Sequence, residues 1–179
     1  LAEDAKKRPG QITVGATLAS TSHIFPALVE KAAGLKFKYV SYDGLAPRMN
    51  AILGGHIDLT DSNLTQKGKV EAGQLKFIAI GTDKRSPEMP NVPTLKELGV
   101  NVSYTVSRGV LAPKGTPGPV LAKLESACAA TVKEAAFADS MKKQATDVAY
   151  LDRQAYAAWL KQNDELNKGL AKELGLLKR

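Results

Sequence analysis

Hydrophobic positions over residues 1–82 fall into short runs whose period changes from one run to the next. Alternating or continuously apolar runs predict β-strands at 11–15, 36–42, 56–61 and 75–82. Between the first three, apolar side chains recur at helical spacing, which predicts helices that begin near Ser20 and Gly44 and end at Gly34 and Gly54. Because strands that alternate with helices favour parallel pairing, the sequence predicts an α/β fold with a mostly parallel sheet.

The pattern changes near Pro87. Three prolines between 87 and 93 prevent regular ladder hydrogen bonding, and Thr94 with Glu97 has the spacing of a capping box for a very short helix. The remaining predicted elements are a strand at 102–113, a helix whose first residue is Pro117 and whose cap is Thr116, and a helix from Arg153 to Lys172. The C-terminal third is therefore predicted to be helical.

The composition is that of an ordinary globular protein. Of the 179 residues 44% are hydrophobic and 24% are charged, and no apolar run reaches the length that spans a bilayer. The formal net charge is +7, but the basic residues are spread over the whole chain and aromatic residues make up only 6%. Since this pattern lacks a basic recognition helix, we expect no nucleic-acid partner and only a mild attraction for small anions.

Residue types that support metal binding or catalysis are sparse. Neither His23 nor His56 has a partner at ligand spacing, so the sequence predicts no metal site. Cys128 stands alone on the apolar face of a predicted helix, which indicates a buried structural thiol. Asp58 and Asp61 close a predicted strand, where carboxylates more often accept hydrogen bonds from turn amides than share a proton. No nucleophile elbow, phosphate loop or dinucleotide fingerprint occurs, so we expect no catalytic residue and no cofactor.

The segment GATLASTSH, residues 15–23, places hydroxyl side chains at the start of a predicted helix. Two interpretations follow. The first turn of a helix presents unpaired amides and a positive dipole end, and Thr17, Ser20, Thr21 and Ser22 can donate toward the same place, so the turn can hold an anion. Alternatively, one hydroxyl is the N-cap of the helix and the others are solvated.

Four stretches resemble one known family when they are taken together. They are GATLASTSH, YVSYDGLAPRMNAILGGHIDL, VEAGQLKFIAIGTDKRSPEMPNVPTLKELG and RGVLAPKGTP, in this order and over nearly the whole chain. The chain resembles the periplasmic solute-binding receptors of tripartite tricarboxylate transporters, the Bug-type receptors. It departs from the family pattern at Thr17 and Ala19, where the family favours glycine, at Ser41 and Asp43, which replace a proline and a lysine, and at Ser107 and Arg108, which replace a frequent aromatic residue.

The resemblance implies a Venus-flytrap receptor of the type II periplasmic-binding-protein class, in which two α/β lobes close around a small carboxylate. On this basis residues 1–103 are expected to form the second lobe. Residues 104–179 would supply a hinge crossover strand and C-terminal helices that return to the first lobe, whose N-terminal part, roughly a hundred residues or one domain's worth, is expected to be missing. The implied partners are the membrane subunits of the transporter, and the implied location is the periplasm.

The resemblance also assigns candidate ligand-binding residues. They are Thr17, Ala19 and Ser20 in the hydroxyl-rich turn, Ser41, Tyr42 and Gly44 in the next loop, Asp61 and Ser62 after the third strand, and Arg108 at the hinge. The sequence leaves two of these open, since Tyr42 equally suits a core aromatic residue and Arg108 a structural salt bridge. His23 is expected to pack or cap rather than to contact ligand.

Two other classes of function are compatible with the pattern. An effector-binding domain of a transcription regulator can share this architecture, and a helix-turn-helix in the full gene would reveal it. A small α/β enzyme is less compatible, because the sequence shows no catalytic group. The C-terminal helices, with Leu124, Cys128, Trp159, Leu166 and Leu170 on apolar stripes, predict self-association of the fragment if nothing covers them.

Overall fold

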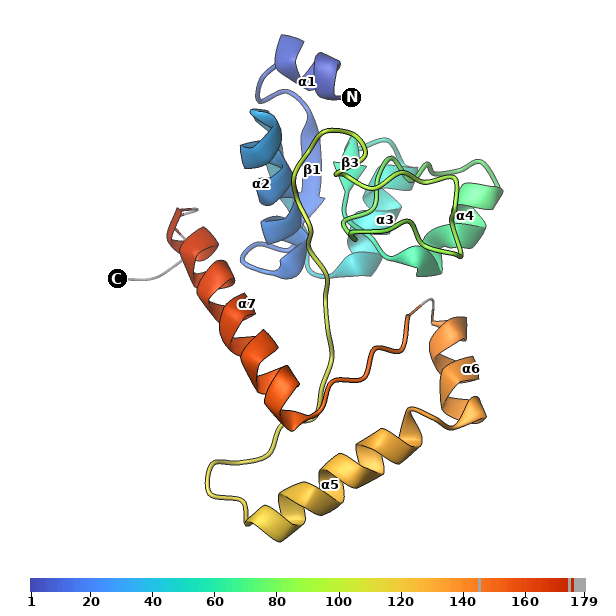
Figure 1. Ribbon diagram of the computed structural model, residues 1–179. Helices are drawn as coiled ribbons and strands as arrows, with labels where there is room; N and C mark the ends of the chain where they lie inside the picture. Colours follow the sequence, from blue (N-terminus) through green and yellow to red (C-terminus); the bar gives the residue numbers. More distant parts are fainter. Residues whose placement is uncertain (145, 174, 176–179) are drawn as a thin grey trace. The chain divides into compact units, whose positions relative to one another are not determined.

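A computed structural model describes residues 1–144, 146–173 and 175 (Figure 1). The chain divides into two compact units. The first, here called the sheet unit, is Leu1–Val106 together with the chain from Leu170 onward, and the second, the helical unit, is Ser107–Gly169. None of the described helices is both long and apolar enough to cross a membrane.

A three-stranded parallel sheet forms the centre of the sheet unit. Strands β1 (Thr13–Ala16), β2 (Lys38–Ser41) and β3 (Leu59–Thr60) lie in the order β2-β1-β3, and β1 pairs in parallel with both neighbours. This confirms the predicted α/β fold with a parallel sheet, although each strand is shorter than the pattern indicated. A Cβ atom at Gly15 in β1 would lie 2.4 Å from Ile57 Cδ1, so a side chain there would require the Ile57 side chain to shift.

The helices of the sheet unit follow their strands as the sequence predicts. Helix α2 (Thr21–Ala33) begins after its N-cap Ser20 and ends at Gly34 in the left-handed conformation, and α3 (Leu45–Leu53) follows Gly44. In Figure 1, α2 lies on one side of β1 and α3 on the other. Helix α1 (Ala2–Lys7), the 3-10 helix η1 (Leu64–Gln66) and α4 (Lys67–Glu71) complete the helices within residues 1–106.

The core of the sheet unit has one main cluster of buried side chains. Its central cluster consists of Ala5, Ile12, Val14 and Phe37, with Leu35, Tyr39 and Leu59 packed against it. Val14, at the middle of β1, is only 1% exposed. Because β1 is covered on both sides and flanked by two strands, it is the most completely buried element of the unit.

Two predicted strands do not form. Residues 75–82 contribute only a single parallel bridge, between Ile80 and Thr94, and 102–113 has no strand assignment. A strand is defined by its neighbour, and no described segment pairs with 102–113 along its length. The capping box is present, since Thr94 N donates to Glu97 Oε2 at 2.7 Å and Glu97 N donates to Thr94 Oγ1 at 3.1 Å, but it closes a turn instead of a helix.

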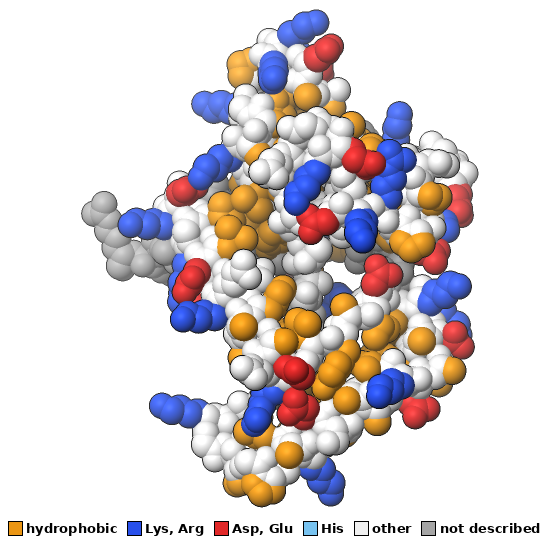
Figure 2. Space-filling model, viewed as in Figure 1, with side chains coloured by type: hydrophobic (Ala, Val, Ile, Leu, Met, Phe, Trp, Pro, Cys, Tyr) orange, Lys and Arg blue, Asp and Glu red, His pale blue; other side chains and the backbone are white. Residues whose placement is uncertain are grey.

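The helical unit contains α5 (Gly118–Thr131), α6 (Ala135–Lys143) and most of α7 (Arg153–Glu173). None of its described residues is buried, and apolar side chains are visible over its surface in Figure 2. Two details differ from prediction: α5 begins at Gly118 with Pro117 as its cap, because the Thr116 hydroxyl donates to Pro113 O, and Cys128 is partly exposed instead of buried. Tyr156 and Trp159 stack with ring centroids 5.9 Å apart.

Candidate ligand-binding site

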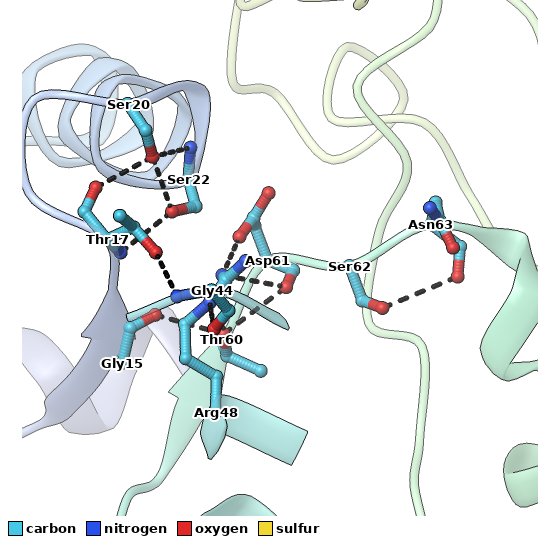
Figure 3. A network of polar contacts seen from close by, with 10 residues as sticks. All are labelled: Gly15, Thr17, Ser20, Ser22, Gly44, Arg48, Thr60, Asp61, Ser62 and Asn63. Carbon is cyan, nitrogen blue, oxygen red and sulfur yellow. Dashed lines mark hydrogen bonds and ion pairs between the residues drawn. The ribbon is translucent and has the colours of Figure 1, made fainter. Parts of the chain in front are cut away.

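Three loops meet at one edge of the sheet, because the carboxyl ends of parallel strands point the same way. They are the turn 17–20 after β1, the loop 42–44 after β2 and the segment 61–63 after β3 (Figure 3). The chain leaves β1 toward β2 on one side and later returns to β3 on the other. The carboxyl end of β1 is therefore a topological switch point, the place where open α/β sheets bind ligands.

Ser20 is the N-cap of α2, as one of the two sequence interpretations predicted. Its Oγ accepts from Ser22 N at 3.2 Å and donates to Thr17 O at 2.7 Å. Ser22 Oγ lies 2.8 Å from Ser20 Oγ and accepts from Thr17 N at 2.9 Å, so the Ser22 hydroxyl donates to Ser20. Because the Ser20 proton is directed at a backbone carbonyl, its hydroxyl shapes the turn from within.

Other donors of the turn have no partner in the described structure. The amides of Leu18 and Thr21 have no acceptor among the described residues. Thr17 Oγ1 accepts from Gly44 N at 3.1 Å, and its own hydrogen has no described acceptor. The turn thus offers two backbone amides and one hydroxyl, at a helix N-terminus where the dipole favours negative charge.

Ala19 has the backbone conformation that usually requires glycine. Its φ is +60°, and no other non-glycine residue in the described ranges has a positive φ. The Ala19 amide donates to His23 Nδ1 at 3.3 Å. His23 is buried and packs edge-on against Tyr39, with ring centroids 4.7 Å apart. Burial lowers the pKa of His23, and the nearby Glu30 charge opposes this. His23 therefore packs and caps, as predicted.

Arg48 on α3 contacts two of the three loops directly, at Gly44 and at Asp61 (Figure 3). Its Nε donates to Gly44 O at 3.1 Å, its Nη1 donates to Thr60 Oγ1 at 3.1 Å, and Nη1 forms an ion pair with Asp61 Oδ1. Thr60 Oγ1 in turn donates to Gly15 O at 2.9 Å. With the Thr17–Gly44 bond, these contacts make one connected network.

Arg48 was not predicted as a site residue, although the sequence carries a signal for it. It lies three residues after Leu45 and four before Ile52, within the apolar stripe of its helix. A charged residue in such a stripe is buried, and its side chain here is only 8% exposed. A buried charge needs a partner, and Asp61 supplies it.

The remaining predicted residues lie in different environments. Tyr42 is partly buried and donates its amide to Ala16 O at 2.9 Å, while the Ser41 and Ser62 side chains are exposed. Within the described part of the chain, Ser62 Oγ makes only a long contact of 3.4 Å with Asn63 O. Arg108 belongs to the helical unit, is exposed and forms no ion pair with any described residue. Thus Thr17, Ala19, Ser20, Ser41, Tyr42, Gly44, Asp61 and Ser62 come from one sheet edge, and Arg108 does not.

Asp58 accepts hydrogen bonds, as the sequence predicted, but its donors are in Thr13 at the start of β1 and not in a turn. Its Oδ2 accepts from Thr13 N at 2.8 Å and from Thr13 Oγ1 at 2.6 Å, and these bonds hold the pKa of the carboxyl below its usual value. Asp61 is paired with Arg48, so the two carboxylates have different partners. Among the described residues, no group of three His, Cys, Asp or Glu side chains is placed to hold a metal ion.

A parallel sheet with donor-rich loops at its switch point is the arrangement in which open α/β folds bind ligands. The chain belongs to the tripartite tricarboxylate transporter receptor family, whose description it matches over residues 1–176. It is 31% identical over 175 residues to the UPF0065 protein in the gbd 5' region of Cupriavidus necator. The aligned residues cover 97% of this chain and 54% of that protein.

Solved structures agree. The periplasmic binding protein BugD superposes with a TM-score of 0.81 at 31% identity, over 99% of this chain and 61% of BugD. R. palustris Rpa4515, solved with adipate, gives a TM-score of 0.83 at 26% identity, over 97% of this chain and 59% of that one. The chain therefore spans 54% to 61% of the length of these three relatives. Membership in a receptor family does not favour the transcription-regulator alternative.

Proposed function

We propose that this chain supplies one wall of a periplasmic receptor that binds a small carboxylate for a tripartite transporter. The observation that carries the proposal is a set of donors at the topological switch point that have no acceptor among the described residues, namely the Leu18 and Thr21 amides and the Thr17 hydroxyl. Carboxylates accept hydrogen bonds from such groups, and the helix dipole stabilises their charge. Adipate in the R. palustris relative is a small dicarboxylate of this kind.

The site holds one buried cation, and that cation is neutralised. Arg48 is paired with Asp61, so the network adds no net charge beside the turn. Recognition of a carboxylate would then depend on neutral donors from the turn 17–20, with Ser41, Tyr42 and Ser62 as adjacent walls. Arg108 belongs to the proposal only as a hinge residue that approaches the ligand in a closed receptor.

The remaining assignments are proposals of the same kind. Residues 1–103 would form the second lobe, and 104–179 the hinge strand and helices that complete the first lobe. The partners would be the membrane subunits of the transporter, and the protein would act without turnover of its ligand. The receptor family to which the chain belongs supports the transporter partners and the absence of turnover.

Titration of the ¹⁵N-labelled chain with adipate, followed by amide chemical shifts, tests the ligand proposal. We expect shifts concentrated at Leu18, Thr21 and Gly44, with a Kd weaker than about 1 μM, because one lobe offers only one wall. A neutral six-carbon diol is the matched control and should leave these amides unmoved. Shifts confined to other residues, or none at millimolar adipate, would refute the proposed site.

Self-association is a second proposal, supported by the uncovered apolar side chains of the helical unit. Val110, Leu111 and Leu124 are 67%, 74% and 42% exposed. Exposed apolar patches of this kind favour contacts between copies. Sedimentation velocity should show a concentration-dependent dimer that Leu124→Gln weakens, whereas the polar control Lys123→Gln should not. A monomer at all concentrations would contradict this.

A further inference from the structure

We propose that His23 is the positioning residue of the ligand-binding turn, because its Nδ1 acceptor holds Ala19 in the left-handed conformation. The effect on ligand affinity rests on the proposed carboxylate site, while the local interaction stands on the structure alone. His23 is not assigned to ligand contact in either case. Its proposed role is to fix the backbone that presents the Leu18 and Thr21 amides.

The first step is the cost of the turn. A left-handed residue with a side chain is disfavoured by steric contact between Cβ and the following carbonyl, and glycine avoids the contact. Ala19 nonetheless has φ +60°. Strained backbone of this kind persists only where its surroundings hold it in place. Ser20 N and Oγ close the turn by donating to Thr17 O at 3.2 and 2.7 Å, and the Ala19 amide itself donates to His23 Nδ1 at 3.3 Å.

The second step is the fixed position of the imidazole. His23 is buried, and Tyr39 packs against it at a ring-plane angle of 72°. The Tyr39 hydroxyl donates to Glu30 Oε2 at 2.9 Å, and Glu30 Oε1 accepts from Phe37 N at 2.8 Å. These bonds between β2 and α2 fix Tyr39, the ring that packs against His23. The imidazole is therefore held in one position, with Nδ1 facing the turn.

The third step is the protonation state. To accept from Ala19, Nδ1 must carry no proton, so His23 is neutral with its hydrogen on Nε2. The titratable groups facing it are Glu30, from the same helix, and Tyr39, from β2. Burial lowers the pKa of His23 more than Glu30 raises it, and burial raises the pKa of Tyr39, which stays protonated. The bond is therefore present at neutral pH and is lost as the pH falls through the depressed pKa.

Three variants of the full chain test the proposal. His23→Leu removes the acceptor, and His23→Asn keeps an acceptor at the position of Nδ1 without a titratable ring. Ala19→Gly removes the need for the restraint. We expect His23→Leu to weaken adipate binding roughly tenfold, the order set by the left-handed cost of alanine. Adding Ala19→Gly to His23→Leu should recover most of that loss, and His23→Asn should bind as the parent does.

Acidification supplies an independent readout. In the parent chain, adipate affinity should decrease at pH values below the usual histidine pKa of about 6.5. The affinities of the His23→Asn and Ala19→Gly variants should depend less on pH. Imidazole ¹⁵N shifts should show an Nε2–H tautomer at neutral pH, and the Ala19 amide signal should move with the same titration midpoint as the ring. These spectra need no ligand.

The outcomes separate this inference from the proposed function. If adipate does not bind but the Ala19 amide titrates with the His23 ring, the ligand proposal fails and the local restraint stands. An Nδ1–H tautomer at neutral pH, or an Ala19 amide that ignores the ring, overturns the inference. It is also overturned if His23→Leu binds adipate as well as the parent. If His23→Leu does not fold, the pH titration of the parent chain and of His23→Asn tests the inference in its place.

Discussion

The sheet unit and the helical unit have similar amphipathic patterns but very different interiors. In the sheet unit, Val14 and Thr94 are 1% and 2% exposed, whereas the described part of the helical unit has no buried residue. Both units have apolar stripes at regular spacing. The difference shows that periodicity is enough to predict a helix and its apolar face. Burial of that face also requires a second surface that packs against it. The sheet unit has that surface within itself.

The largest expected effect is at the buried ion pair of the sheet unit. Replacing Arg48 with Met leaves the Asp61 carboxylate, largely buried, without a cation, so we expect a loss of about 3 kcal/mol in the free energy of unfolding. Urea denaturation followed by circular dichroism measures it. The double variant Arg48→Met with Asp61→Asn should recover part of the loss, because no buried charge remains unpaired. Equal losses in the single and double variants would contradict a charge effect.

A matched pair of truncations compares the two units directly. Ile12→Ala in the sheet unit removes a side chain that is 3% exposed and should cost about 2 kcal/mol or more. Leu124→Ala in the helical unit removes one that is 42% exposed and should change stability by less than about 0.5 kcal/mol. Measurement is by denaturation at low protein concentration, where contacts between copies are absent. A large loss at Leu124 would show that the helical unit has a core of its own.

A smaller loss than at Ile12 is expected at the turn. Ser20→Ala removes the N-cap of α2 and the hydrogen bond to Thr17 O, and should cost about 1 kcal/mol in folding stability. Because the Ser20 hydroxyl proton is already donated to Thr17 O, we expect the loss of adipate-binding free energy to be smaller than the loss of folding free energy. Thermal unfolding and titration of the same variant provide the two values. Ser62→Ala, whose hydroxyl makes only one long contact, is the control.

Much of the sheet unit could be predicted from sequence, because local signals and tertiary contacts agree there. The helix after β1 has a hydroxyl cap at Ser20, an apolar stripe and a terminating glycine at Gly34, and each appears in the structure. The run 102–113 has an equally strand-like pattern but forms no strand. Val102 is buried, but the apolar residues further along, Val106 and Leu111 among them, are exposed, because a pattern does not provide a pairing partner.

The candidate site was predicted only in part. Position in the chain was enough to place Thr17 and Gly44 at one edge, since both follow strands of a parallel sheet. Two features depend on contacts that a single sequence does not contain. Arg48 forms an ion pair with Asp61, and Ala19, which has a positive φ, donates its amide hydrogen bond to His23 Nδ1. The polar residues that determine the shape of the site are therefore less predictable than the strands that carry it.

The strand order also has a kinetic consequence. Val14 of β1 pairs with Tyr39 of β2 and with Leu59 of β3, and the first pairing closes a loop little more than half as long as the second. Loop-closure entropy therefore favours β1–β2 as the early contact. Until β3 docks, β1 exposes a free edge, and Arg48 has neither Thr60 nor Asp61 to bind. We expect the sheet edge that carries the candidate site to be the last part of the unit to become ordered during folding.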